Sequence, residues 1–376
     1  MAKAPSQRDH VLIFGAAGAI GKQLVTALSK DLPPGSVIAA LRRTPLPDTL
    51  TKDASGAEVV VCELGVNLRD TASVSAVVLK YADRIGAIWN LAAPLSVETE
   101  NDPSAAEDTT VGGMRRLIQA MDDAGLPPET KLLFSDSIGS FGGSSPRLDV
   151  PASWLVANPT QDPGSEYGRQ KRRCRELLAG SRYDTRWVII PGVLHNDPVW
   201  GAGTTEYALD ALLHFHRHRT GGDGSGAAQS FACPVRQDTL LPMIHSEDLT
   251  RGLVALMAAE RSALCEPEQG YALAGFSFSP RDLAACLANS NAASQAGPSG
   301  GLSAWDASFA ATDGPAGCFA ELWPDSISGA EAERDLGWRA VAGLADTVDS
   351  ILRAHAARDM EVNKAHTSAQ SGATQD

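Results

Sequence analysis

Val11-Leu12-Ile13-Phe14-Gly15-Ala16-Ala17-Gly18-Ala19-Ile20-Gly21 is the stretch that decides the fold of this 376-residue chain. Its first four residues are an apolar run of buried-strand length, and a helix with an apolar stripe follows. Glycines between a strand and a helix let the backbone approach a pyrophosphate, whose negative charge the helix N-terminus faces. The stretch therefore predicts a dinucleotide site, and a plain turn with close strand–helix packing is the alternative. The residues that would form the site are Gly15, Ala17, Gly18, Ala19, Ile20 and Gly21.

Short apolar strands alternate with amphipathic helices as far as Ile190. We expect strands at 11–14, 37–41, 58–62, 87–91, 131–135 and 186–190. Such alternation predicts an α/β fold, Rossmann-like, with a doubly wound parallel sheet and helices on both faces. After Pro191 the rhythm breaks, and we expect a smaller C-terminal substrate lobe.

The chain is expected to divide as follows. Residues 1–192, with about 246–268, form the dinucleotide-binding domain, and 193–245 with 269–356 form the substrate lobe. Residues 357–376 are polar and aperiodic, which predicts a disordered tail.

Composition limits the class of protein. The net charge is −13, which disfavours binding to nucleic acid or to anionic membranes. No apolar run reaches the length of about 18 residues that a membrane span needs, and the polar start of the chain lacks a secretory signal. The six cysteines form no CxxC pair, and His214, His216 and His218 alternate along an expected solvated helix end, so we expect no metal site. These features predict a soluble, acidic, globular protein of the cytoplasm.

The end of the second expected strand bears on which dinucleotide is bound. A carboxylate there would bind the ribose 2′-hydroxyl of NAD, whereas an arginine accommodates the 2′-phosphate of NADP. Arg42 and Arg43 follow this strand and no carboxylate does, which favours NADP slightly over NAD. The alternative is that both arginines are ordinary surface cations. Asn67, after the third strand, is placed to bond the adenine edge.

Tyr167 and Lys171 form a YxxxK pair at the start of a helix, where a spacing of four puts both side chains on one face. A free tyrosine has a pKa of about 10, and a nearby ammonium favours its phenolate, which can then exchange a proton with a substrate hydroxyl. Ser137, at the carboxyl end of the fifth strand, would hold the same substrate oxygen. Ser135 and Asp136 compete for that role.

These residues resemble the extended branch of the short-chain dehydrogenase/reductase superfamily, which is the NAD-dependent epimerase/dehydratase superfamily. Within it, the chain is most similar to the short-chain type of L-threonine 3-dehydrogenase. The likeness runs from residue 11 to about 355. Its most specific stretches are Gly203-Thr204-Thr205-Glu206-Tyr207-Ala208, similar to the GTTDYA segment, and Leu322-Trp323-Pro324-Asp325-Ser326, similar to the SWPxS segment.

The resemblance implies hydride transfer between NAD(P) and the C3 carbinol or ketone of a β-hydroxy or β-keto amino acid such as L-threonine. It also points to a homodimer. Implied substrate contacts are Ser96, Ser137, Gly203, Thr204, Thr205, Glu206 and Trp323. Implied cofactor contacts beyond the glycine loop and the arginines are Asn67, Leu68, Leu91, Ala92, Ala93, Ser135, Tyr167, Lys171 and Pro191.

The chain departs from the family pattern at several positions. Leu41 replaces the usual acidic residue, Glu206 replaces an aspartate, and Asp136 replaces a serine and would add a charge near the nicotinamide site. An insertion at about 288–304 is also extra. Two alternatives therefore stay open, an NADP-dependent biosynthetic ketoreductase on a related small molecule and a nucleotide-sugar epimerase or dehydratase.

Overall fold

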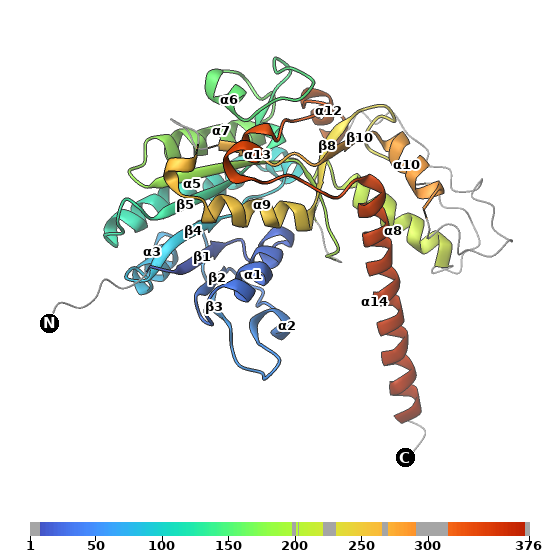
Figure 1. The fold of residues 1–376 in the computed structure, drawn as a ribbon, viewed down its shortest axis with the longest axis horizontal. Helices are drawn as coiled ribbons and strands as arrows, with labels where there is room; N and C mark the ends of the chain where they lie inside the picture. Colours follow the sequence, from blue (N-terminus) through green and yellow to red (C-terminus); the bar gives the residue numbers. More distant parts are fainter. Residues whose placement is uncertain are drawn as a thin grey trace.

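The computed structural model describes residues 8–197, 201, 203–220, 231–264, 270–290 and 315–372. Its main sheet has seven parallel strands in the order β3-β2-β1-β4-β5-β6-β9 (Figure 1). They are β1 (His10–Phe14), β2 (Val37–Leu41), β3 (Val60–Leu64), β4 (Ile85–Asn90), β5 (Lys131–Ser137), β6 (Asp184–Ile190) and β9 (Gly270–Ala272). The strand order reverses between β1 and β4, and open α/β sheets bind ligands beside such a point, at the carboxyl ends of the strands. The predicted α/β fold is confirmed.

Helices cover both faces of this sheet because the strands are apolar on both. Val11 and Ile13 of β1 pack in one core with α1 (Ala19–Asp31) and α9 (Ser246–Ala258). Leu12 and Phe14 pack in the opposite core with three other helices. These are α3 (Thr71–Lys80), α5 (Pro103–Asp123) and α7 (Glu166–Ala179). Alternate residues of a strand point to opposite faces, so a continuous apolar run such as β1 requires a layer on each side.

Short helices lie in the connections of this α/β domain. They are α2 (Asp48–Thr51), α4 (Ser96–Asn101), α6 (Ser153–Ala157) and the 3₁₀ helices η1 (Ile138–Ser140) and η2 (Arg261–Ala263). The segments α4 and η1 follow β4 and β5 at the carboxyl edge of the sheet, where they help to form the cavity described below.

In the described ranges, the smaller lobe contains a second sheet, in the order β10-β8-β7, and five helices. Its strands are β7 (Gly192–Leu194), β8 (Leu241–His245) and β10 (Phe276–Phe278). Its helices are α8 (Tyr207–Thr220), α10 (Pro280–Ala288), α12 (Pro315–Leu322), α13 (Ala330–Leu336) and α14 (Leu344–Gly372). Asp248 of α9 accepts hydrogen bonds from the amides of Val341 and Ala342 and so anchors the segment before α14.

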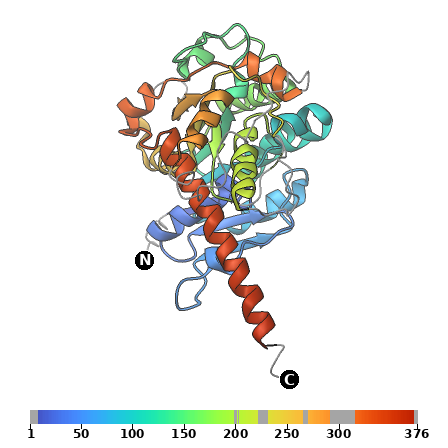
Figure 2. The same ribbon diagram turned by 90° about the vertical axis from the view of Figure 1, so that its right-hand side faces the viewer.

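The structure differs from the expected boundaries in two places. β9 pairs with β6 in the main sheet, although we placed residues from 269 onward in the substrate lobe. A three-residue strand has too little periodicity to be recognised. The prediction of disorder from 357 is wrong as far as Gly372, because α14 continues to that residue. Its C-terminal half extends away from the rest of the fold (Figures 1 and 2), so it needs no apolar stripe there.

His216 also departs from the expected solvated helix end. It lies on α8 and is buried against α14. Its Nε2 is 2.7 Å from Oδ2 of Asp359, and its ring stacks on that of His355 with 5.4 Å between the ring centroids. Asp359 lies in the segment predicted to be disordered, so this hydrogen bond could not be foreseen. None of the helices in the described ranges combines the length and apolar character that crossing a membrane requires.

Candidate active site

A cavity of about 760 Å³ opens at the carboxyl edge of the main sheet and is lined by both lobes. The main-sheet domain contributes the glycine loop, the ends of β4 and β5 and the start of α7. The smaller lobe contributes β7, Gly201, the segment 203–206 and Trp323, which follows α12. Residues widely separated in the sequence therefore meet in one cavity.

The glycine loop has the shape of a diphosphate cradle. Gly15 has a φ of +81°, and a Cβ there would lie 2.8 Å from the amide nitrogen of Ala92. A Cβ on Gly21 would lie 2.2 Å from the carbonyl oxygen of Gly15, so only glycine fits either position. Gly18 is the N-cap of α1, where no side chain caps the helix and no acidic residue occupies the first turn. An uncapped helix N-terminus lining a cavity suits an anion, so these residues fit the diphosphate of a dinucleotide.

Tyr167, Lys171 and Ser137 line the same cavity. Lys171 is buried, donates to the carbonyl oxygen of Ser135 at 2.7 Å, and its Nζ lies 5.4 Å from the centroid of the Tyr167 ring. Gly139 lies between the other two groups, because a Cβ on it would be 2.8 Å from Cδ1 of Tyr167 and 3.6 Å from Oγ of Ser137. The phenol, the ammonium and the hydroxyl thus gather where β5 ends and α7 begins.

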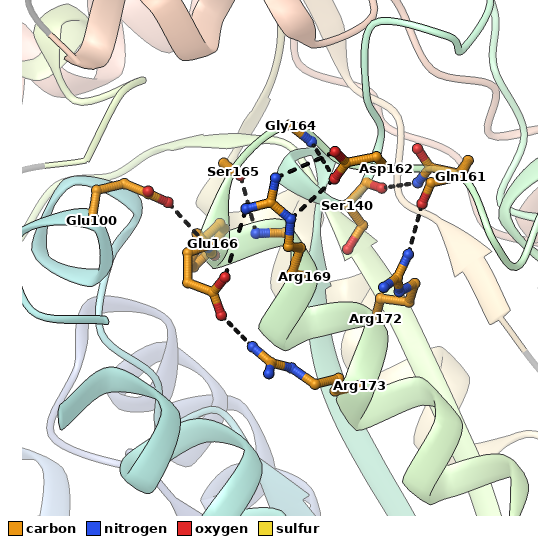
Figure 3. A network of polar contacts seen from close by, with 12 residues as sticks. Glu100, Ser140, Gln161, Asp162, Gly164, Ser165, Glu166, Arg169, Arg172 and Arg173 are labelled. Atoms are coloured by element: carbon orange, nitrogen blue, oxygen red, sulfur yellow. Dashed lines mark hydrogen bonds and ion pairs between the residues drawn. The ribbon is translucent and has the colours of Figure 1, made fainter. Parts of the chain in front are cut away.

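A polar network surrounds the first turn of α7 (Figure 3), the turn to which Tyr167 belongs. Glu100 of α4 accepts a hydrogen bond from the backbone amide of Tyr167 at 3.0 Å, and Ser165 caps the helix. Arg169 pairs with Asp162 in the preceding loop at 3.1 Å. Because Glu100 is on α4, this network also links the tyrosine to the helix that carries Ser96.

Asp136 forms a buried ion pair. Its carboxylate pairs with Arg175 of α7 and accepts bonds from the Ser140 hydroxyl at 2.5 Å and the Ser137 amide at 2.7 Å. Arg175 in turn lies over the ring of Trp187, with 5.3 Å between the guanidinium and the ring centroid. The charge that we expected near the nicotinamide site is therefore compensated by a cation one helical turn beyond Lys171.

The other end of the cavity is built from hydroxyls and a carboxylate. The hydroxyls of Ser96 and Thr204 lie 3.1 Å apart, and Oε2 of Glu206 accepts the amide of Gly203 at 2.5 Å. Burial raises the pKa of Glu206, and the nearby charges of Asp210 and Glu98 raise it further. The hydrogen bonds that Glu206 accepts from the Gly203 and Gly201 amides lower this pKa, but by less.

Cations gather at the glycine-loop end. Arg42 lines the cavity there, and so does Lys22, whose ammonium bonds Asp197 of the segment after β7 at 2.6 Å. His195 also lines the cavity, and burial lowers its pKa, so the imidazole is neutral at neutral pH.

The predicted site residues fall into two groups. Arg43, Asn67, Leu68 and Ala92 do not line the cavity; Ala92 instead supports Gly15, and the Asn67 side chain bonds the amide of Arg69 at 3.2 Å. All the others line it. Sequence reasoning missed Lys22, Glu98 and His195 as lining residues, and only Lys22, directly after the last glycine, carried a local signal. In the described part of the chain, no three His, Cys, Asp or Glu side chains gather where a metal ion could be held.

Residues 11–263 match the model of the NAD dependent epimerase/dehydratase family, and the chain belongs to that family. It is 27% identical over 350 residues to an uncharacterized epimerase/dehydratase of Staphylococcus haemolyticus, covering 92% of this chain and 97% of that one. It is 26% identical to the mitochondrial L-threonine 3-dehydrogenase of Bos taurus, over 93% of this chain and 83% of the relative. Among solved structures, the GalE-like L-threonine dehydrogenase from Cupriavidus necator in its holo form matches with a TM-score of 0.73 and 26% identity, over 92% and 99% of the two chains. Together these findings support an enzyme of the short-chain dehydrogenase/reductase type with a nicotinamide cofactor.

Proposed function

We propose that this enzyme transfers hydride between NAD(P) and a secondary alcohol or ketone beside an amine-bearing carbon, as at C3 of a β-hydroxy amino acid such as L-threonine. The observation that carries the proposal is that Tyr167, Lys171 and Ser137 share one cavity with a glycine loop shaped for a diphosphate. The similarity to proteins named L-threonine dehydrogenases supports the substrate class.

In this proposal Tyr167 is the proton acceptor for alcohol oxidation and the proton donor for ketone reduction. The ammonium of Lys171, 5.4 Å from the ring centroid, stabilises the phenolate while the proton moves. Ser137 donates a hydrogen bond to the same substrate oxygen and holds it beside the phenol. A bound nicotinamide dinucleotide supplies the hydride chemistry.

NADP is the slightly favoured cofactor. Arg42 lines the cavity next to the end of β2, where a 2′-phosphate would lie, and β2 ends in Leu41 rather than in a carboxylate. Arg43 does not line the cavity, so Arg42 alone carries this argument.

The substrate would lie between the hydroxyls and Trp323. Ser96 and Thr204 present polar groups from the two lobes, and Trp323 closes the cavity as a wall. Thr205 and Glu206 follow Thr204 in the same lining segment.

The test is the absorbance of reduced nicotinamide with L-threonine, its C3 epimer and β-keto analogues, each assayed with both cofactors. We expect turnover with at least one substrate and loss of turnover in Tyr167→Phe. Absence of turnover with all of them would contradict the proposal. Conversion of a nucleotide sugar without net change in the cofactor would favour an epimerase instead.

A further inference from the structure

The substrate end of the cavity carries charges of one sign only. The lining between 93 and 98, the described lining between 201 and 206, and Trp323 include two carboxylates, Glu98 and Glu206. The same described lining includes no lysine, arginine or histidine. Substrate specificity is set in part by such charges, because each attracts one class of ligand and repels another.

Glu98 lies in the first turn of α4 and Glu206 directly precedes α8, and both line the same part of the cavity. Glu98 lies at the exposed rim, where its Oε2 accepts the amide of Leu95 at 3.2 Å. Glu206 is more buried and bonds the amide of Gly203. The start of α4 touches the segment before α8, since a Cβ on Gly201 would lie 2.5 Å from Cδ1 of Leu95 and 3.9 Å from Oε2 of Glu206. The charge of Glu98 reaches Glu206 and contributes to its raised pKa.

The cations that line the cavity do not compensate these charges. Lys171 bonds the carbonyl oxygen of Ser135, and Lys22 pairs with Asp197. Arg42 follows β2 at the glycine-loop end, and His195 is neutral because burial lowers its pKa. Asp210 adds a third acidic group near Glu206.

The neutral donors of this region still suit a polar ligand. The indole N–H of Trp323 is buried and has no acceptor within the described ranges, although Trp323 lines the cavity. A buried donor without a partner costs stability, and a substrate oxygen would supply its acceptor. The indole N–H can donate a hydrogen bond to a hydroxyl or carbonyl oxygen of the substrate. Because the indole is uncharged, it supplies no positive charge to balance a free carboxylate on the substrate.

We propose that Glu98 and Glu206 select a cationic substrate, namely a 1,2-amino alcohol whose carboxylate is absent or masked as an ester or amide. The ammonium group would lie against the two carboxylates, which attract it and repel a free carboxylate. This inference rests on the proposed function and narrows its substrate class.

The experiment compares kcat/KM for 1-amino-2-propanol, L-threonine methyl ester and L-threonine in the intact enzyme and in Glu98→Gln. We expect the intact enzyme to prefer the two cationic substrates over threonine by about tenfold or more. Glu98→Gln should reduce this preference about fivefold, mainly through KM, because glutamine keeps the size and removes the charge. Glu129→Gln, which removes an exposed carboxylate before β5, is the matched control and should leave the preference unchanged.

Two outcomes would overturn the proposal while leaving the proposed function intact. One is a preference for free threonine, and the other is an unchanged preference in Glu98→Gln. If none of the three is oxidised and the C3 epimer and β-keto analogues give no turnover either, the proposed function fails. Calorimetric binding of 1-amino-2-propanol to the cofactor-loaded enzyme then still tests whether the two carboxylates select a cation. Affinity about fivefold weaker in Glu98→Gln supports it, and equal affinity refutes it.

Discussion

Asp136→Asn should strongly destabilise this protein. The carboxylate of Asp136 is fully buried and the side chain of Arg175 is only 8% exposed. Because water does not solvate either charge well, each is stabilised mainly by the opposite charge of its partner. Asparagine keeps the shape and one oxygen acceptor, but it leaves the guanidinium without a counter-charge. The bond that the carboxylate accepts from Ser140 is also at risk.

The expected cost follows from this burial. Removing one partner of a buried ion pair typically costs about 3–5 kcal/mol, against a total unfolding free energy of about 5–15 kcal/mol for a typical domain. The double variant Asp136→Asn with Arg175→Met removes both charges, and we expect it to recover about 1–3 kcal/mol relative to simple addition of the two single losses. Arg169→Met, which breaks the exposed pair with Asp162, should cost at most about 1 kcal/mol.

Urea unfolding of the four variants, followed by circular dichroism, measures these differences. Activity should fall with stability in Asp136→Asn, because the same carboxylate accepts the amide of Ser137. A loss below about 1 kcal/mol for Asp136→Asn, or strict additivity in the double variant, would refute the reasoning.

Three further predictions concern pH and the cofactor. Burial, with Arg358, His216 and Arg217, lowers the pKa of His355 to about 4, so this residue is neutral in the folded protein and gains a proton on unfolding below its ordinary value of 6.5. The free energy of unfolding that His355 contributes is therefore present above pH 6.5 and is lost as the pH falls toward 4, by up to about 3 kcal/mol. Urea unfolding at a series of pH values should show a smaller loss of stability with falling pH in His355→Phe. The same pH dependence in both proteins would contradict this. Arg42→Ala should weaken NADPH binding about tenfold in fluorescence titrations and leave NADH binding unchanged, whereas equal losses would remove the NADP assignment. Asp197→Asn removes the charge from the bond to Lys22 that joins α1 to the segment after β7. Stopped-flow release of the cofactor should therefore be a few-fold faster, and an unchanged rate would show that this ion pair does not retain the cofactor.

The main sheet could be predicted because its signals are local. The apolar run at Val11 followed by glycines defines a strand, a turn and a helix within about a dozen residues. The YxxxK spacing is also local, so Tyr167 and Lys171 were found as a pair. The expected strand at 58–62 lies two residues before the observed β3, because alternating burial in this strand leaves its ends poorly marked.

Contacts between distant residues could not be predicted. Asp136 and Arg175 are 39 positions apart, and nothing in either segment indicates that they pair. Glu98 and Glu206 come from different lobes, and their proximity depends on how Leu95 and Gly201 pack. His216 looked solvated because its partners on α14 lie about 140 residues later, in a helix whose polar end has no periodic pattern.

The rate of hydride transfer in Tyr167→Phe tests the central claim most directly, namely that this phenol exchanges the proton with the substrate. Single-turnover formation of reduced nicotinamide should be at least about a hundredfold slower than in the intact enzyme, since general acid–base groups contribute about 10²–10⁴-fold. The cofactor should bind both proteins with the same affinity. An unchanged single-turnover rate, with the cofactor fully bound, would contradict the account.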